Sequence, residues 1–287
     1  MSTDLAEELK IQSVRDLEQA KSILKQGENL EHVAWFCEQS YEKLIKHVYA
    51  HFKIKIQNRS VSGVYDKIFR AGHYDSPDLV LNMLGELARE FWDMYNRGLS
   101  VLPKLSDSDR TILKRFIDNV PQDALRRNER HIESIRRKID MVVNKDKEFE
   151  SFLRNSTYEK LHESMMKYDY NQIIDQTVAK NTAGLEGLVG VDPNVLMKGI
   201  NSQLYKDYYL FVAKLLGLAE WLLPNISGSR YPLRESGFGN LKLYRELNDQ
   251  LILFFGYMVS ILDGLQTGKD RFISSIISIL KTGSDQH

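Results

Sequence analysis

The chain has 287 residues, of which 43% are hydrophobic and 27% charged, so it can bury a sizeable core and wholesale disorder is excluded. Lysine and arginine total 39, as do aspartate and glutamate, and this balance excludes a uniformly basic surface that coats nucleic acid, while a local basic patch remains compatible with it. The single cysteine, Cys37, excludes an internal disulfide and fits a reducing compartment.

The N-terminal part of the chain predicts two antiparallel helices. The first is expected from about Thr3 to Lys25, with Gly27 as its C-terminal stop, and the second from Leu30 to Phe52. The short turn between them should make the two helices pack as a hairpin. At about 100° per residue, one stripe of the second helix collects the predicted core positions. They are Ala34, Cys37, Tyr41, Leu44, Ile45, Val48 and Phe52.

The pattern changes after this hairpin. From Phe52 to Ile56 apolar residues alternate with lysines, which predicts an extended segment. A third helix is predicted from Val61 to about Arg70, and no strand is evident later in the chain. Further helices are expected to begin near Ser76, Ser106, Asp123, Ser156 and Asp192.

The C-terminal part predicts a long apolar helix from Leu241 to Leu265 and a short one from Asp270 to Lys281. Its most apolar run, LILFFGYMVSIL, has about twelve residues, whereas a spanning helix needs about twenty, so we expect a buried core helix. The acidic N-terminus lacks the apolar stretch of a signal peptide. These features predict a cytoplasmic protein with no membrane association.

The block from Ser13 to Phe52 carries a resemblance to a known family. It places Phe36, Gln39 and Ser40 before a Glu-Lys-Leu-Ile-Lys run, and Arg-Ser-Val follows the block. A second block, from Leu218 to Leu262, holds an Arg-Tyr-Pro loop between two helices. In this order, the blocks resemble the opening and closing halves of HEPN domains, prokaryotic helical bundles often found beside minimal nucleotidyltransferases.

The resemblance implies an all-α fold, namely a HEPN-like antiparallel helical bundle with an inserted helical subdomain. The bundle would be discontinuous in sequence, made of residues 1–74 and 204–287. Residues 75–203 have no counterpart in a minimal HEPN domain, so they are interpreted as the helical insertion.

The same resemblance implies a homodimer that binds RNA or a nucleotide, in a prokaryotic defence or toxin–antitoxin setting and beside a nucleotidyltransferase-type partner. Active members are metal-independent ribonucleases that use an Arg and a His four to six residues apart, and no cofactor or metal is implied. Arg230 would be the motif arginine, but Glu-Ser-Gly occupies the positions of the expected histidine. Binding would then fall to Arg230, Tyr231 and Arg234, since arginines can still meet a phosphate.

The segment from Arg126 to Lys138 is a second basic candidate, with Arg126, Arg127 and Arg130 as possible nucleic-acid contacts. Arg126 and His131 also have the spacing of the ribonuclease motif. On a helix, positions five apart lie about 140° apart, so these two side chains would not converge. His131 is therefore a weak catalytic candidate.

Three interpretations of function remain open: an RNA or nucleotide binder, a ribonuclease with an atypical active site, and a non-catalytic dimerisation or interaction scaffold. The basic segment could equally be a solvated face in which Glu133 pairs with Arg136 or Arg137. His47 and His51 have a spacing that can hold a metal, but they lack a third ligand and are interpreted as an edge pair of the bundle.

Overall fold

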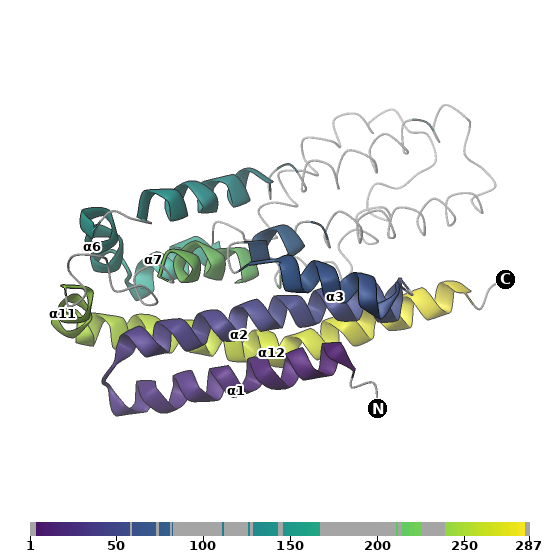
Figure 1. The fold of residues 1–287 in the computed structure, drawn as a ribbon, viewed down its shortest axis with the longest axis horizontal. Helices are drawn as coiled ribbons and strands as arrows, with labels where there is room; N and C mark the ends of the chain where they lie inside the picture. Colours follow the sequence, from purple (N-terminus) through teal and green to yellow (C-terminus); the bar gives the residue numbers. More distant parts are fainter. Residues whose placement is uncertain are drawn as a thin grey trace, which may run out of the picture.

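The computed structural model describes residues 4–57, 59–72, 75–80, 82, 111, 126, 129–142, 146–166, 211, 214–225 and 239–284. Regular structure in this part of the chain is helical throughout, without a strand, which confirms the predicted all-α fold (Figure 1). The helices form a bundle whose lower layers in Figure 1 are the N-terminal hairpin and the C-terminal helix.

The N-terminal hairpin consists of α1 (Leu5–Gln26) and α2 (Leu30–His51). The Asp4 carboxylate accepts a hydrogen bond from the Ala6 amide (3.2 Å), which satisfies one of the free N–H groups at the start of α1. Gly27 ends the helix with φ 69°, a left-handed conformation that glycine adopts without strain. The turn then returns the chain along α1, as predicted.

The core runs along the inner face of this hairpin. All seven residues of the predicted α2 stripe are buried, which confirms the helical periodicity analysis. The long helix α12 (Asn248–Ser284) packs against both α1 and α2. It contributes Leu251, Phe254, Phe255, Met258 and Leu262 to the core.

The extended segment predicted after α2 is wrong, because residues Phe52–Ile56 form a π-helix, η1. The Gln57 amide donates to the Phe52 carbonyl (3.1 Å), so the helix widens instead of ending. Lys53 is buried; its ammonium group donates to the Gln57 side chain (3.1 Å) and lies 5.5 Å from the centre of the Tyr49 ring. The alternation was misleading because this lysine does not face solvent. The third helix, α3 (Val61–Arg70), has the predicted bounds.

A second group of helices packs against the hairpin. It comprises residues 129–142, α6 (Asp146–Arg154), α7 (Tyr158–Met166) and residues 214–225. The Tyr41 hydroxyl of α2 donates to the Leu215 carbonyl (2.9 Å), and the Trp221 indole donates to Ser164 of α7 (2.9 Å). These helices share one hydrophobic core with the hairpin. The division into a bundle and an insertion stays a prediction.

The C-terminal part differs from the prediction in its breaks. A short helix, α11 (Gly239–Glu246), precedes α12, and the two are separated at Leu247. Helix α12 then runs without the break predicted between Leu265 and Asp270. A single glycine such as Gly268 costs a helix only about 1 kcal/mol, and no proline follows to end it.

A polar contact joins α1, α2 and α12 inside the bundle. The Gln266 side-chain amide donates to the Ser13 carbonyl (3.1 Å), the Ser13 hydroxyl (2.9 Å) and the Ser40 hydroxyl (3.0 Å). The Ser13 hydroxyl in turn donates to the Ser40 carbonyl (2.8 Å). Both serines are fully buried, so this contact fixes the register of three helices.

We expect Gln266→Ala to lower the free energy of unfolding by about 1–3 kcal/mol, because buried polar groups of Ser13 and Ser40 lose a donor. Urea denaturation at one fixed protein concentration would measure the loss. The matched control is Gln26→Ala at an exposed position of α1, which should stay within about 0.5 kcal/mol of the parent chain. Equal urea midpoints for the two variants would contradict a stabilising contribution of the Gln266 hydrogen bonds.

Candidate functional site

The residues predicted to bind RNA fall into two groups. Arg230, Tyr231 and Arg234, together with Arg127, lie outside the described residues. Arg126, Arg130 and His131 are described. So are the helices that come directly before and after the segment that carries Arg230. The geometry of the candidate site is therefore built from these flanking elements.

The two flanking ends meet at one end of the bundle. The described part of the helix 214–225 reaches Asn225, and α11 begins at Gly239. The Tyr244 hydroxyl of α11 donates to the Asn225 side-chain oxygen (3.1 Å), and the Asn225 amide donates to the Trp221 carbonyl (2.7 Å). This buried pair holds together the ends of the segment that carries Arg230.

Tyr244 is held in its neutral form. Burial, and to a smaller degree the nearby negative charge of Glu31, raises the pKa of the Tyr244 phenol well above its usual range. The hydroxyl therefore keeps its proton and serves as the donor to Asn225. Glu31 belongs to the start of α2, and α11 packs against this helix.

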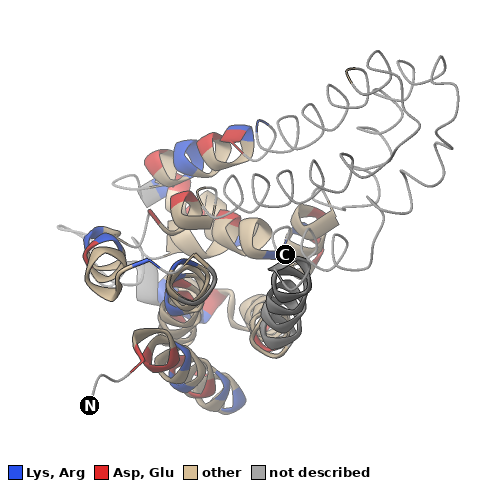
Figure 2. Ribbon diagram, turned by 90° about the vertical axis from the view of Figure 1, so that its right-hand side faces the viewer, with Lys and Arg blue, Asp and Glu red and all other residues tan. Residues whose placement is uncertain are grey.

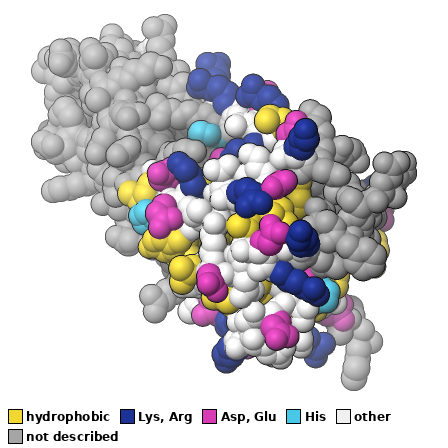
Figure 3. Space-filling view, turned by 90° about the vertical axis from the view of Figure 1, so that its left-hand side faces the viewer, with side chains coloured by type: hydrophobic (Ala, Val, Ile, Leu, Met, Phe, Trp, Pro, Cys, Tyr) yellow, Lys and Arg dark blue, Asp and Glu magenta, His cyan; other side chains and the backbone are white. Residues whose placement is uncertain are grey.

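An open pocket of about 550 Å³ lies at this same end of the molecule. It is formed by the turn between α1 and α2 and by the junction of α11 with α12. Figure 3 looks onto this end and shows acidic and basic side chains interspersed across it. The polar residues that line the pocket are Glu28, Asn29, Glu31, Tyr244, Arg245 and Asn248.

The pocket combines groups of opposite chemistry. Arg245 can bind a phosphate or carboxylate, whereas Glu28 and Glu31 accept hydrogen bonds from hydroxyl or amino groups. Asn29 adopts φ 54°, a left-handed conformation uncommon for a residue other than glycine, and its side chain does not cap α2. The lining therefore suits a small molecule with one anionic group and several donors better than a long polyanion.

The described residues of the basic segment do not form a continuous positive face. Arg126 and Arg130 are exposed, and the Arg130 guanidinium donates to the Arg126 carbonyl (3.3 Å) one turn earlier. His131 is partly buried, and the helical backbone keeps it five positions from Arg126. Blue and red residues alternate along this uppermost helix in Figure 2.

Other charges of this helix hold the bundle together. Arg136 pairs with Asp78, so the pairing with Glu133 predicted from sequence is wrong; Arg137 donates to the Glu133 backbone carbonyl (3.4 Å). The sequence could not reveal Asp78 as a partner, because it comes from a helix far away in the chain.

Lys138 pairs with Glu220 and lies 4.9 Å from the centre of the Trp221 ring. Glu220 is buried, so this ammonium group neutralises a carboxylate that would otherwise be costly inside the protein. Two of the basic residues, Arg136 and Lys138, therefore hold this helix to its neighbours.

The described part of the chain holds neither a group of metal ligands nor a reactive thiol. Groups of three or more His, Cys, Asp or Glu side chains that could hold a metal are absent from it. The His47 ring shares a hydrogen bond with the Ala6 carbonyl of α1 and is buried, so its predicted place at the edge of the bundle is wrong. Burial raises the pKa of the Cys37 thiol, so it stays protonated within the core.

Helix α12 has one membrane-like property. Over Asn248–Thr267 its mean hydropathy is 1.2. By length and composition alone, this stretch of the helix is long and apolar enough to cross a membrane. Within the described residues 44% of this window is buried, and its buried face packs on α1 and α2 in the manner of a core helix.

An aromatic cluster that sequence reasoning missed lies on the surface between α7 and α12. The rings of Tyr158 and Tyr257 are 4.6 Å apart, and the Tyr257 hydroxyl lies 3.1 Å from the His162 Nδ1. Partial burial and the neighbouring Tyr158 raise the pKa of Tyr257, so its phenol is the donor. The only sequence signal was the spacing of four between Tyr158 and His162.

Comparison with known proteins adds no family: no protein-family model, curated protein or solved structure matches this chain.

The buried Tyr244 predicts a stability loss at alkaline pH. Its pKa is raised above the value of about 10 for a tyrosine in the unfolded chain, so above pH 10 the unfolded chain loses a proton that the folded chain keeps. The free energy of unfolding should therefore fall as pH rises, and Tyr244→Phe should remove up to one proton, about 1.4 kcal/mol per pH unit, from that slope. Urea midpoints between pH 8 and 11 would measure it.

The control for this experiment is Tyr65→Phe, at an exposed ring of α3, which should keep the slope of the parent chain. A slope that Tyr244→Phe leaves unchanged would contradict the burial of this phenol in the native state.

Proposed function

We propose that this chain is a HEPN-like nucleotide- or RNA-binding protein that works as a homodimer without the usual ribonuclease motif. The observation that carries the proposal is the pocket of about 550 Å³ next to the two ends of the segment that bears Arg230, Tyr231 and Arg234. The binding site combines Arg245 and the arginines of that segment for a phosphate with Glu28 and Glu31 for ribose hydroxyl or base amino groups.

Two further observations support the HEPN likeness. The blocks that resemble the opening and closing halves of the family are far apart in sequence, yet α1, α2 and α12 pack side by side and share the Gln266 contact. In the sequence, the Arg-Tyr-Pro segment lies between a helix that is described up to Asn225 and one that begins at Gly239. By the same likeness, the setting would be prokaryotic defence or a toxin–antitoxin pair, in the cytoplasm, with a nucleotidyltransferase-type partner.

A mixed charge at the pocket favours a nucleotide or the end of an RNA over a long internal stretch of RNA. Two carboxylates face one guanidinium in the described lining, and a run of phosphates would be repelled by the excess negative charge. A single phosphate bound at Arg245 would leave the carboxylates for neutral donor groups.

The test is one gel series with labelled single-stranded RNA in EDTA, repeated at several salt concentrations. We expect the parent chain to shift the RNA intact and Arg230→Ala to bind about tenfold more weakly, with a salt slope smaller by about 0.7, since one phosphate contact is lost. The matched control is Arg15→Ala, at an exposed position of α1, which should bind as the parent does. Competition with a mononucleotide would tell a nucleotide site from an RNA site.

Other outcomes would replace this function. Cleavage in EDTA that Arg230→Ala or His131→Ala abolishes would establish a metal-independent ribonuclease with an atypical active site. Neither a shift nor competition at any salt concentration would overturn ligand binding and leave the interaction scaffold.

A further inference from the structure

Helix α3 carries an aromatic stripe that is open to solvent. Val64 and Ile68 pack into the core, whereas Val61, Tyr65 and Phe69 are 53%, 42% and 70% exposed. The three exposed positions are four apart, so at about 100° per residue they run along one side of the helix. The centres of the Tyr65 and Phe69 rings lie 4.6 Å apart. Exposed rings that are contiguous in this way mark an interaction surface on a folded protein.

The chain around this stripe is basic, although the whole chain has balanced charge. Between positions 53 and 70 there are five lysines and arginines and a single acidic residue, Asp66. Arg59 precedes the stripe and Arg70 follows it, and both are exposed. Neither arginine makes an ion pair within the described residues, and the same is true of Lys67. The aromatic stripe therefore lies between cations whose charge is not neutralised there.

The packing of α3 against α2 adds further positive charge. The ammonium groups of Lys53 and Lys67 lie 5.5 Å and 5.6 Å from the centre of the same Tyr49 ring. Attraction to the ring holds each lysine, but two ammonium groups that share one ring also repel each other. A negative group bound at this surface would offset that repulsion.

The charges decide which kind of partner fits the stripe. A second copy of the chain, related by a two-fold axis, would bring the same cations against each other. Lipid is also a poor partner, because a helix of ten residues offers only three exposed apolar side chains and carries Asp66 beside them. Single-stranded nucleic acid supplies both complementary features, since its phosphates are negative and its bases stack on aromatic rings.

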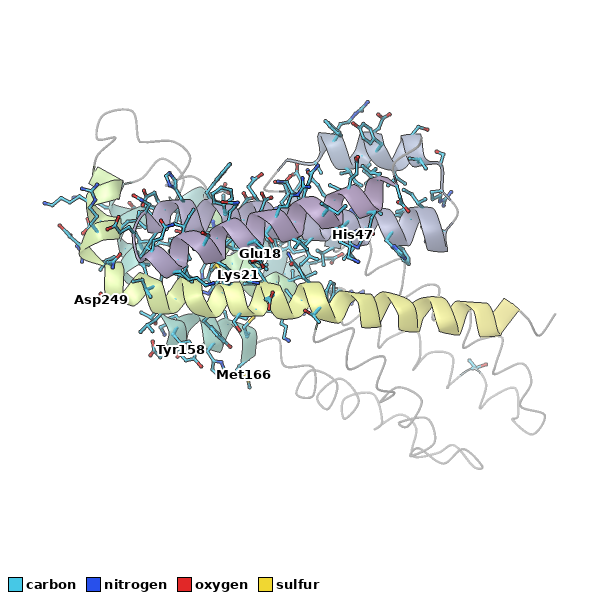
Figure 4. The ribbon with its side chains drawn as sticks, turned by 90° about the horizontal axis from the view of Figure 1, so that it is seen from below. Glu18, Lys21, His47, Tyr158, Met166 and Asp249 are labelled. Atoms are coloured by element: carbon cyan, nitrogen blue, oxygen red, sulfur yellow. The ribbon has the colours of Figure 1, made fainter. Side chains whose placement is uncertain are left out.

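This surface is remote from the pocket. The pocket lies at the start of α2, and α3 follows the other end of that helix, which at 22 residues is about 33 Å long. Figure 1 shows α3 beside the end of α2 that lies away from α11. In Figure 4, Asp249 marks the end of the molecule with the pocket, and His47 lies far along α2 from it, toward α3. The aromatic stripe and the pocket are therefore separate sites.

We propose that α3 is a second contact surface for single-stranded RNA, on which a base stacks against Phe69 and Tyr65 while Arg59 and Arg70 contact phosphates. The choice of RNA as the ligand rests on the proposed function, whereas the surface itself is additional to it. The pocket, with its excess of carboxylates, suits a nucleotide or an RNA end. The surface on α3 is positive and open, so it suits the internal nucleotides of a strand.

The first test separates stacking from mere apolar contact. Fluorescence anisotropy would measure the affinity of the full chain for a short labelled single-stranded RNA in EDTA. We expect Phe69→Leu to weaken binding about tenfold, because it keeps an apolar side chain but loses the ring, and Phe69→Trp to retain the affinity of the parent chain. Leu253→Ala is the matched control, because this residue is 68% exposed on α12 and should not affect RNA binding.

The second test concerns the phosphate contacts. Arg70→Gln should lower the salt slope of RNA binding by about 0.7, since one phosphate contact to a single strand is lost. Arg15→Gln, at an exposed position of α1, should leave the slope unchanged. Both positions are exposed, so circular dichroism should show the helix content of the parent chain for each variant.

The outcomes separate this surface from the proposed function. If Phe69→Leu binds RNA as the parent does while Arg230→Ala binds more weakly, the surface on α3 is overturned and the proposed function stands. If only Phe69→Leu weakens binding, the surface on α3 is supported and the RNA contact of Arg230 is overturned.

Two further results would overturn the surface on α3. The first is a parent chain that binds no RNA at low salt; a mononucleotide that still binds would then support the pocket alone. The second is binding to phosphatidylserine vesicles that Phe69→Asp abolishes, together with RNA binding that Phe69→Asp leaves unchanged. That result would assign the aromatic stripe to a lipid surface.

Discussion

The arrangement of this protein depends on the polar contact at the centre of three helices. Ser13 of α1 and Ser40 of α2 are buried, and Gln266 of α12 supplies the hydrogen bonds that their hydroxyl groups and the Ser13 carbonyl require. Apolar side chains alone would let long helices slide past one another at small cost, whereas a displaced Gln266 would leave buried polar groups without partners. The contact therefore fixes where α12 begins relative to the hairpin, and with it the position of everything that α12 carries.

The candidate ligand site is a consequence of that register. Because α12 starts beside the turn between α1 and α2, Arg245 and Asn248 come next to Glu28, Asn29 and Glu31 and enclose a pocket. The Tyr244 contact with Asn225 then brings both ends of the Arg-Tyr-Pro segment to the same end of the bundle. The described ends of the segment proposed to bind a phosphate therefore lie at the same end of the bundle as a pocket with hydrogen-bond acceptors.

Some charged residues hold helices together and others lie free on the surface, and composition could not reveal which do which. Lys138 and Arg136 look like members of a basic patch, yet they pair with Glu220 and Asp78 and hold the helix 129–142 in place. Conversely, the apolar helix α12 is only partly covered by the other described residues, and Leu253 on it is exposed. A balanced overall charge is thus compatible with a helix that is fixed to its neighbours by ion pairs.

The sequence by itself determined the local elements. Gly27 and Asn29 mark the hairpin turn, and the spacing of apolar residues in α2 identified its buried stripe, since both signals arise from backbone conformation and helical period. It failed where a local pattern fits two structures. The alternation that includes Lys53 predicted an extended segment, yet this lysine is buried in a π-helix, and the break predicted between Leu265 and Asp270 lies within the continuous helix α12. Only the tertiary structure decided that Gln266 meets Ser13 and Ser40, that Arg136 meets Asp78 and that Tyr257 meets His162. These partners are far apart in sequence, and hydrogen bonds and ion pairs depend on distances of a few ångströms that helical periodicity does not encode.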